Sequence, residues 1–170
     1  MQLPDPEILQ SEITAQIVNS ITPNTALVGI HSGGVWIMEH VLASIKHDIP
    51  FGTLDASLYR DDFAQRGLKD KPQPANIPFD VQDKHIILID DIFYTGRTTR
   101  AAINELFDFG RPASISLAVL INRGGAQLPI NPQMVGADIT LQPDQRFKLT
   151  QNEQGKLNLA LENNQDTGNV

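Results

Sequence analysis

The chain has 170 residues, a formal charge of −7 and no cysteine. This length can bury one hydrophobic core, and 41% apolar residues is typical of a globular domain. Twenty acidic against 13 basic residues argue against bulk nucleic-acid binding, which needs clustered Lys and Arg. Without cysteine there is neither a disulfide nor thiol chemistry, and we expect a cytoplasmic protein. No apolar run is long enough to span a bilayer and the first residues lack the pattern of a signal peptide, so we expect no membrane contact.

The first third of the chain predicts helices that alternate with short strands. Asp5 and Pro6 are typical of a helix start, an N-cap residue followed by proline at the first helical position. Apolar residues at helical spacing extend this helix to about residue 20. The elements expected next are a buried strand over 26–30, a glycine-bearing turn over 31–34, a helix over 35–46 and a strand over 51–59.

A polar, proline-dotted segment follows at about residues 60–80 and shows no clear periodicity. Loops this long are uncommon in compact domains unless they carry function or are disordered. We therefore expect a flexible loop here, and both a lid over a binding site and a plain insertion remain open.

The second half predicts the same alternation of strands and helices. We expect a strand over 85–89, a helix over 97–109 that ends at Gly110, a strand over 114–121, a loop over 122–134, short strand-like pieces to 161 and a disordered tail over 162–170. Alternating strands and helices indicate an α/β fold, with a mostly parallel central sheet flanked by helices. We expect a single domain over 1–161.

Two adjacent carboxylates, Asp90 and Asp91, follow the apolar run of residues 86–89. In open α/β sheets, ligands bind beyond the carboxyl ends of the strands. An unpaired buried charge is costly, so the pair suggests a ligand. The alternative is that one aspartate caps the next turn while the other faces solvent.

The segment from Thr95 to Thr99 predicts a phosphate site. It forms a turn into a helix, where free backbone N–H groups and the helix dipole favour an anion. Gly96 allows a close backbone approach, and Arg97 adds a guanidinium. An acidic pair that accepts from hydroxyls, followed by a phosphate cradle, predicts a site for a sugar phosphate.

These residues carry a resemblance to a known family. Residues 86–98, IILIDDIFYTGRT, resemble the phosphoribosyl-pyrophosphate (PRPP) motif of type I phosphoribosyltransferases. The flanking segments LYRDD, GRPASISLAVL and RGGAQLPINPQMVG resemble the PyrR type, regulators of pyrimidine operons that are also uracil phosphoribosyltransferases. The resemblance covers about residues 26–147. It implies the type I phosphoribosyltransferase fold, with a small hood at about 122–150.

The resemblance implies that PRPP and uracil react to UMP and pyrophosphate. Asp90 and Asp91 would hold the ribose hydroxyls, and Arg60, in the expected loop, is the third catalytic candidate. Mg²⁺ would be bound mainly through PRPP and water, with Asp90 as a candidate ligand. The other binding residues implied are Thr95, Gly96, Arg97, Thr98 and Thr99 for the 5-phosphate, His31, Ser32 and Gly33 for the pyrophosphate, and Arg123 and Phe147 in the hood over the base.

Two departures from the family pattern matter. The pyrophosphate turn resembles Gly-Ile-Lys-Thr-Arg-Gly in the family but is GIHSGG here, so a lysine and an arginine are lost. This weakens catalysis or gives the role to another arginine such as Arg60. The first helix carries Glu7 and Glu12 but no basic residue, which argues against the RNA binding of the regulatory branch. The resemblance also implies a homodimer or larger oligomer.

Three other functions remain open. A regulator that binds UMP or PRPP with little turnover would keep the site and tolerate the altered turn. A phosphoribosyltransferase for another base would differ only in the hood. A receiver-type signalling domain also places acidic residues at a strand end, but on its first strand, whereas this pair lies in the middle of the chain.

Overall fold

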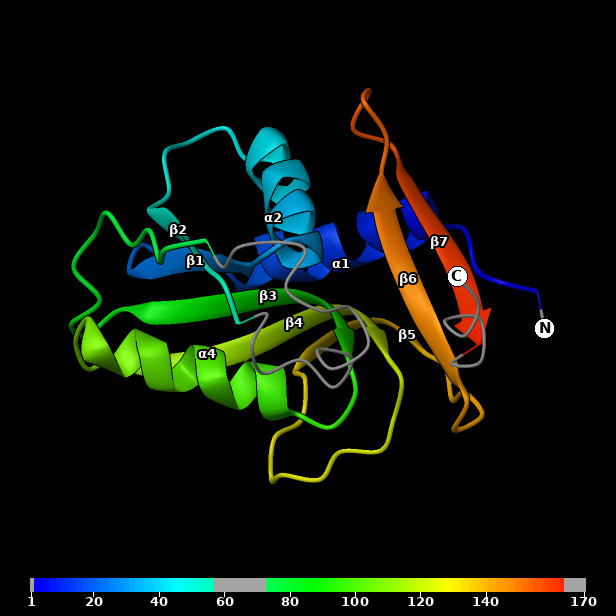
Figure 1. The fold of residues 1–170 in the computed structure, drawn as a ribbon. Helices are drawn as coiled ribbons and strands as arrows, with labels where there is room; N and C mark the ends of the chain where they lie inside the picture. The colour runs from blue at the N-terminus through cyan, green and yellow to red at the C-terminus, as the bar shows by residue number, and fades with distance from the viewer. Residues whose placement is uncertain (1, 57–72, 164–170) are drawn as a thin grey trace.

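The computed structural model describes residues 2–56 and 73–163 of the chain (Figure 1). Its centre is a sheet of five parallel strands in the order β2-β1-β3-β4-β5. The predicted α/β architecture is therefore confirmed. The strands are β1 (Thr25–Ile30), β2 (Phe51–Leu54), β3 (His85–Phe93), β4 (Ser114–Asn122) and β5 (Met134–Asp138).

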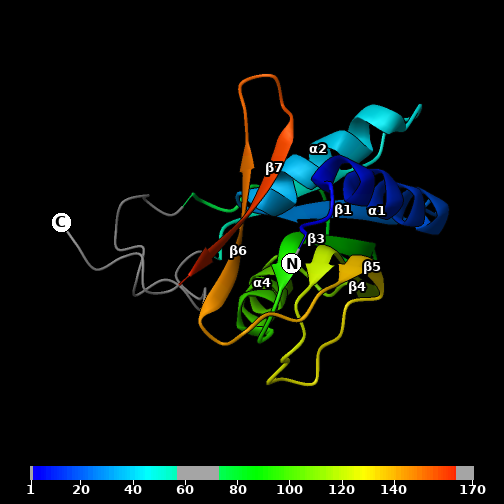
Figure 2. The same ribbon diagram turned by 90° about the vertical axis from the view of Figure 1, so that its right-hand side faces the viewer.

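Helices cover both faces of this sheet (Figure 2). On one face α1 (Pro6–Ser20) and α2 (Gly33–Ser44) share a core with strand residues such as Leu27 and Ile87. On the other face α4 (Arg97–Asp108) packs on the strand residues that precede and follow these in the chain, because successive side chains of a strand point to opposite faces. No helix of the described residues is long and apolar enough to cross a membrane.

The strand order reverses between β1 and β3. From β1 the chain passes through α2 to β2 on one side, then returns to β3 on the other side of β1. The two strands are in register, with Gly29 opposite Ile89. Their carboxyl ends therefore meet at the point where open α/β sheets bind ligands.

The strand lengths differ from those expected. β3 continues to Phe93, beyond the acidic pair, whereas β2 ends at Leu54. Residues 73–80 were expected to belong to a flexible loop, but Asn76 forms two backbone hydrogen bonds with Thr53, at 2.8 and 2.9 Å. This end of the loop is thus tied to β2. The part from 57 to 72, including Arg60, lies outside the described residues.

A two-stranded antiparallel ribbon, β6 (Gln145–Gln151) and β7 (Leu157–Asn163), crosses the carboxyl edge of the sheet (Figures 1 and 2). It differs from the hood expected over 122–150, since that range contains β5, which belongs to the central sheet. One face of the ribbon is apolar and buried against α1 and α2. Its backbone is also tied to α1, because Leu157 N donates to Glu7 Oε1 at 2.9 Å.

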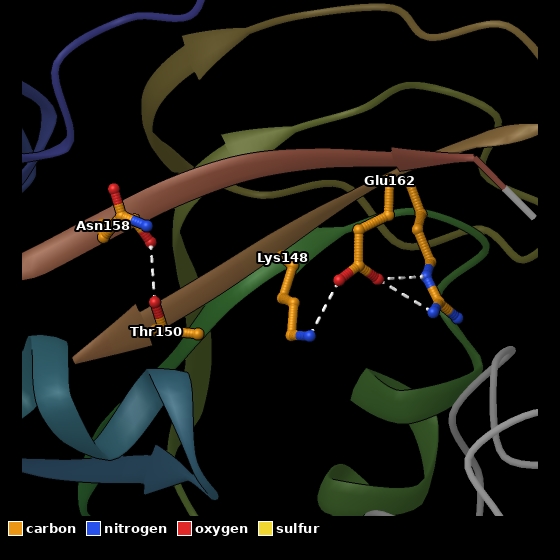
Figure 3. A network of polar contacts seen from close by, with 5 residues as sticks. Lys148, Thr150, Asn158 and Glu162 are labelled. Carbon is orange, nitrogen blue, oxygen red and sulfur yellow. Dashed lines mark hydrogen bonds and ion pairs between the residues drawn. The ribbon is translucent and has the colours of Figure 1, made fainter. Parts of the chain in front are cut away.

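The opposite face of the ribbon carries a polar network (Figure 3). Glu162 accepts from Arg146 and, at 2.7 Å, from Lys148. Thr150 donates to the carbonyl of Asn158 at 3.5 Å. The strand therefore continues through Glu162 and Asn163, two residues into the segment expected to be disordered, because these contacts hold it.

The network lowers the pKa of Glu162. The hydrogen bond from Lys148 is the largest cause; burial opposes it, while the hydrogen bond from Arg146 and the two positive charges add to it. A carboxyl whose folded pKa is depressed stabilises the fold above its unfolded pKa of about 4.5. That contribution is lost as the pH falls through the folded pKa.

We expect Glu162→Gln to lower the free energy of unfolding at pH 7 by about 0.5 kcal/mol, the scale of a surface salt bridge. The difference between variant and wild type should shrink as the pH falls below 4.5. Urea unfolding at pH 7 and pH 3.5 measures it. Glu153→Gln, at the exposed turn of the same ribbon, is the matched control. A deficit that is equal at both pH values would contradict the electrostatic origin.

Docking of α1 on the sheet is tested by one buried and one exposed isoleucine. Ile17 is fully buried in the core, whereas Ile8 on the same helix is 58% exposed. Ile17→Ala should lower the free energy of unfolding by about 2–4 kcal/mol, and Ile8→Ala by less than about 1 kcal/mol. Urea unfolding monitored by circular dichroism gives both values; similar losses for the two variants would show that α1 is not docked in this way.

Candidate functional site

The acidic pair lies near the end of β3, and the backbone that follows fixes its orientation. Asp90 is 3% exposed, and its Oδ1 accepts from the backbone N–H of Asp91 at 2.9 Å. Asp91 Oδ1 accepts in turn from the N–H of Ile92 at 2.9 Å. Each carboxylate is thus anchored through one oxygen. The ligand role of the pair stays a prediction beside these backbone contacts.

The turn after β1 lies directly against this pair. A β-carbon built at Gly33 would overlap the side chain of Asp91, and one built at Gly34 would overlap the carbonyl of Ile89. Only glycine fits at these two positions with the neighbouring strand where it is. The structure therefore brings the predicted pyrophosphate turn and the predicted ribose-binding pair together, although about 57 residues separate them in the chain.

Gly33 stands where the family pattern has an arginine. Because the carboxylate of Asp91 occupies the space of a β-carbon there, a larger residue would require Asp91 to move. The turn itself starts α2: Ser32 is the N-cap residue, is exposed and makes no side-chain capping bond. The peptide bond between His31 and Ser32 is cis. Because α2 starts shortly after the end of β1, the N–H groups of its first turn lie at this edge of the sheet.

The predicted phosphate cradle has the geometry of a helix N-terminus. Gly96 is the N-cap residue of α4 with a φ of 92°, which glycine adopts without strain. Thr95 and Thr99 are buried, at 4% and 2% exposure, whereas Arg97 is exposed. The first turn of α4 contains no acidic residue, so no side chain of that turn neutralises the positive end of the helix dipole. An anion can bind there.

Residues 123–128, which we call the strap, lie along this motif; the sequence placed them in the hood over the base and predicted no contact with the motif. Arg123 N donates to the carbonyl of Phe93 at 2.9 Å, and the Arg123 guanidinium lies 3.8 Å from the ring centre of Tyr94. Gly125 packs so close to Tyr94 that a β-carbon would lie 2.8 Å from the ring. The sequence offered no signal for this contact, because the partners are about 30 residues apart.

The two residues predicted to form the hood over the base are placed differently. Phe147 is 6% exposed and belongs to the core between the ribbon, α1 and α2. Arg123 is 9% exposed and donates to the carbonyl of Gln142 at 3.4 Å in addition to its stacking on Tyr94. Arg123 therefore joins the segment before the ribbon to the phosphate motif, and Phe147 anchors the ribbon. Contact with a base stays a prediction for both.

A metal ion would need ligands from the substrate. In the described parts of the chain, no group of three or more His, Asp or Glu side chains could hold a metal ion by itself. Asp90 and Asp91 nevertheless offer carboxylate oxygens, which Mg²⁺ prefers, and Mg²⁺ is often bound by one or two carboxylates together with substrate phosphates and water. The residues present fit such a shared site.

The fold resembles that of solved phosphoribosyltransferase structures. A hypoxanthine-guanine phosphoribosyltransferase from Bacillus anthracis aligns with a TM-score of 0.63 and 20% identity, covering 85% of each chain. A hypoxanthine phosphoribosyltransferase from Staphylococcus aureus gives a TM-score of 0.61 at 21% identity, over 82% of this chain and 77% of that one. At these identities the likeness establishes the fold.

Sequence comparison establishes the family. Residues 4–145 match the family described as "Phosphoribosyl transferase domain". A protein named "Bifunctional protein PyrR" from Pseudomonas savastanoi pv. phaseolicola is 43% identical over 166 residues, 95% of each chain. The protein of the same name from Nitrosococcus oceani is 50% identical over 127 residues, 74% of this chain and 72% of that protein. The chain therefore belongs to the phosphoribosyltransferase family with the type I fold, and within it to the PyrR proteins.

Proposed function

We propose that this chain transfers the phosphoribosyl group of PRPP to uracil, giving UMP and pyrophosphate. One observation carries the proposal: a turn at the start of α2, an acidic pair near the end of β3 and a phosphate cradle at the start of α4 meet at the reversal of strand order. These three sites match the pyrophosphate, the ribose and the 5-phosphate of PRPP. The choice of uracil rests on membership among the PyrR proteins.

Asp90 and Asp91 bind the ribose in this proposal. Their carboxylates accept hydrogen bonds from the two ring hydroxyls, and their backbone anchors hold them in position before the substrate arrives. As the bond between the anomeric carbon and pyrophosphate breaks, positive charge develops on the sugar ring. The nearby carboxylates stabilise that charge, and no protein nucleophile is needed.

The two helix N-termini bind the two ends of PRPP. The 5-phosphate lies in the turn from Thr95 to Thr99 and accepts from backbone N–H groups and threonine hydroxyls. The pyrophosphate lies at the turn of His31, Ser32 and Gly33, at the start of α2. Mg²⁺ held through the substrate, with Asp90 as a candidate ligand, would neutralise part of the leaving group's charge.

The base-binding side and the loop complete the proposed site. Uracil lies toward the ribbon and the segment before it, and Arg123 and Phe147 act there by holding these elements in place or by touching the base. Arg60, proposed as a catalytic residue of the loop, is outside the described residues. Closure of that loop would keep water away from the charged ring.

RNA binding belongs to the regulatory half of this proposal. Two of the basic residues described, Arg146 and Lys148, share the carboxylate of Glu162, which offsets part of their charge. α1 carries no basic residue in its last turn. Any RNA site would therefore make few phosphate contacts, so its affinity would be low and its dependence on salt shallow. A homodimer or larger oligomer stays a prediction of the family resemblance.

A second candidate is a UMP- or PRPP-sensing regulator with little turnover. The observation that favours it is Gly33, since an arginine of the family pattern is missing beside the leaving group. The ribose and 5-phosphate sites do not depend on that arginine. Binding without product would identify this second function.

Product formation is the first test. We expect the purified protein with PRPP, Mg²⁺ and uracil to form UMP and pyrophosphate in equal amounts, and to form at least about tenfold less nucleotide from orotate, hypoxanthine or guanine. Chromatographic quantification of each nucleotide measures this. Product from a purine alone would overturn the assignment of the base, and bound PRPP or UMP without any product would favour the sensing function.

The acidic pair is tested by a double substitution that keeps its shape. Asp90→Asn with Asp91→Asn retains the Oδ1 acceptors for the backbone N–H groups but removes both charges. We expect affinity for UMP and PRPP to fall by about a hundredfold or more, because each charged hydrogen bond contributes about 1.5–3 kcal/mol. Isothermal titration calorimetry measures it, and circular dichroism shows that the variant folds.

The control for this double substitution removes the same charge elsewhere. Asp48 and Asp108 are exposed and lie near the opposite edge of the sheet, so Asp48→Asn with Asp108→Asn should leave UMP affinity within about twofold. Equal losses in the two double variants would show that net charge matters and that the pair at 90 and 91 does not bind the ribose.

A further inference from the structure

Backbone hydrogen bonds join the strap to the phosphate cradle and to the strand before it. Gln127 N donates to the carbonyl of Thr95 at 2.9 Å. This bond follows the one from Arg123 N to the carbonyl of Phe93, two residues earlier in the motif. Leu128 also packs near Gly96, with its Cβ 3.6 Å from where a β-carbon of Gly96 would lie. The strap thus occupies carbonyls of the motif. At the start of α4 the N–H of Arg97 donates to Thr95 Oγ1 at 3.4 Å, and the N–H groups that follow in the first turn have no partner within the helix.

The side chain of Gln127 holds the one guanidinium of the cradle. Arg97 Nη1 donates to Gln127 Oε1, which joins the strap to the first residue of α4. A guanidinium has five N–H donors in a planar fork, so this bond leaves others for a second acceptor. Both side chains are exposed, so without this bond Arg97 would sample many rotamers.

The position of Arg97 at the start of α4 indicates that the second acceptor is an anion. A cation at a helix N-terminus is unfavourable, because it faces the positive end of the helix dipole. An anion that contacts both the N–H groups and the guanidinium removes this repulsion. The neutral amide of Gln127 orients Arg97 without neutralising it, which a carboxylate at the same position would do.

We propose that Gln127 is a positioning residue of the 5-phosphate subsite, which acts through Arg97. It fixes the guanidinium beside the N–H groups of the cradle, so that the phosphate meets a preformed donor set and less conformational entropy is lost on binding. This inference rests on the proposed function for the identity of the ligand as a ribose 5-phosphate group.

The test compares a ligand with the phosphate and one without it. We expect Gln127→Ala to weaken UMP binding about fivefold and to leave uridine binding unchanged, because only UMP reaches Arg97. Gln127→Glu keeps an acceptor in place but pairs with Arg97, so UMP affinity should fall at least as far. If Gln127 acted by packing alone, the Gln127→Glu variant would bind UMP as tightly as the wild type. Gln154→Ala, at the exposed turn of the ribbon, is the matched control.

A double-mutant cycle tests whether the effect passes through Arg97. In an Arg97→Ala background, Gln127→Ala should cause no further loss of UMP affinity. The proposal is overturned if the loss persists undiminished there, if UMP and uridine weaken equally, if Glu restores the affinity, or if the wild type does not bind UMP. Failure of the proposed function alone looks different: UMP binding depends on Gln127 as described, but PRPP and uracil give no product.

Discussion

The parallel pairing of β1 with β3 is the constraint on which the rest of the site depends. With Gly29 opposite Ile89, β1 ends beside the acidic pair of β3, and the turn after β1 lies against the carboxylate of Asp91. Glycine at positions 33 and 34 makes this contact feasible, because any β-carbon would overlap β3. The close approach places the start of α2 and the acidic pair side by side, which are the proposed pyrophosphate and ribose sites. Neither element alone would recognise a phosphorylated sugar.

The second consequence of this pairing is electrostatic. α2 and α4 both begin at the carboxyl edge of the sheet, and neither has an acidic residue in its first turn. Two positive helix ends therefore lie at the same edge of the sheet as two carboxylates. This alternation of charge suits a ligand with anionic ends and a neutral sugar between them. It also lets a protein with a net charge of −7 bind a strongly anionic substrate.

The helix α1 joins the ribbon to the central sheet. Its apolar face enters the core with the ribbon, while Glu7 accepts from Leu157 N and Gln16 forms hydrogen bonds with both backbone groups of Val135. The amide of Gln16 thus occupies the free edge of β5 as a neighbouring strand would. Through α1, the central sheet and the ribbon share one core. The strap then connects the segment before the ribbon with the phosphate motif, since Arg123 contacts both Gln142 and Tyr94.

The sequence by itself determined the features that are local in the chain. The strand, acidic pair, glycine turn and helix from 85 to 108 are contiguous, and each has a strong local signal: an apolar run, adjacent charges, a glycine in the turn and helical periodicity. Element order was enough to predict a parallel α/β sheet. Only the tertiary structure decided the contacts between distant segments: Gly33 against Asp91, Arg123 on Tyr94, and Gln127 with Arg97. The end of the ribbon also depended on the fold. Its polar residues are typical of a loop in the sequence, whereas in the structure Glu162 pairs with Arg146 and Lys148. Such contacts join residues that are far apart in sequence and leave no periodic pattern. They arise from the packing of distant segments and not from the local conformational preferences that a sequence shows.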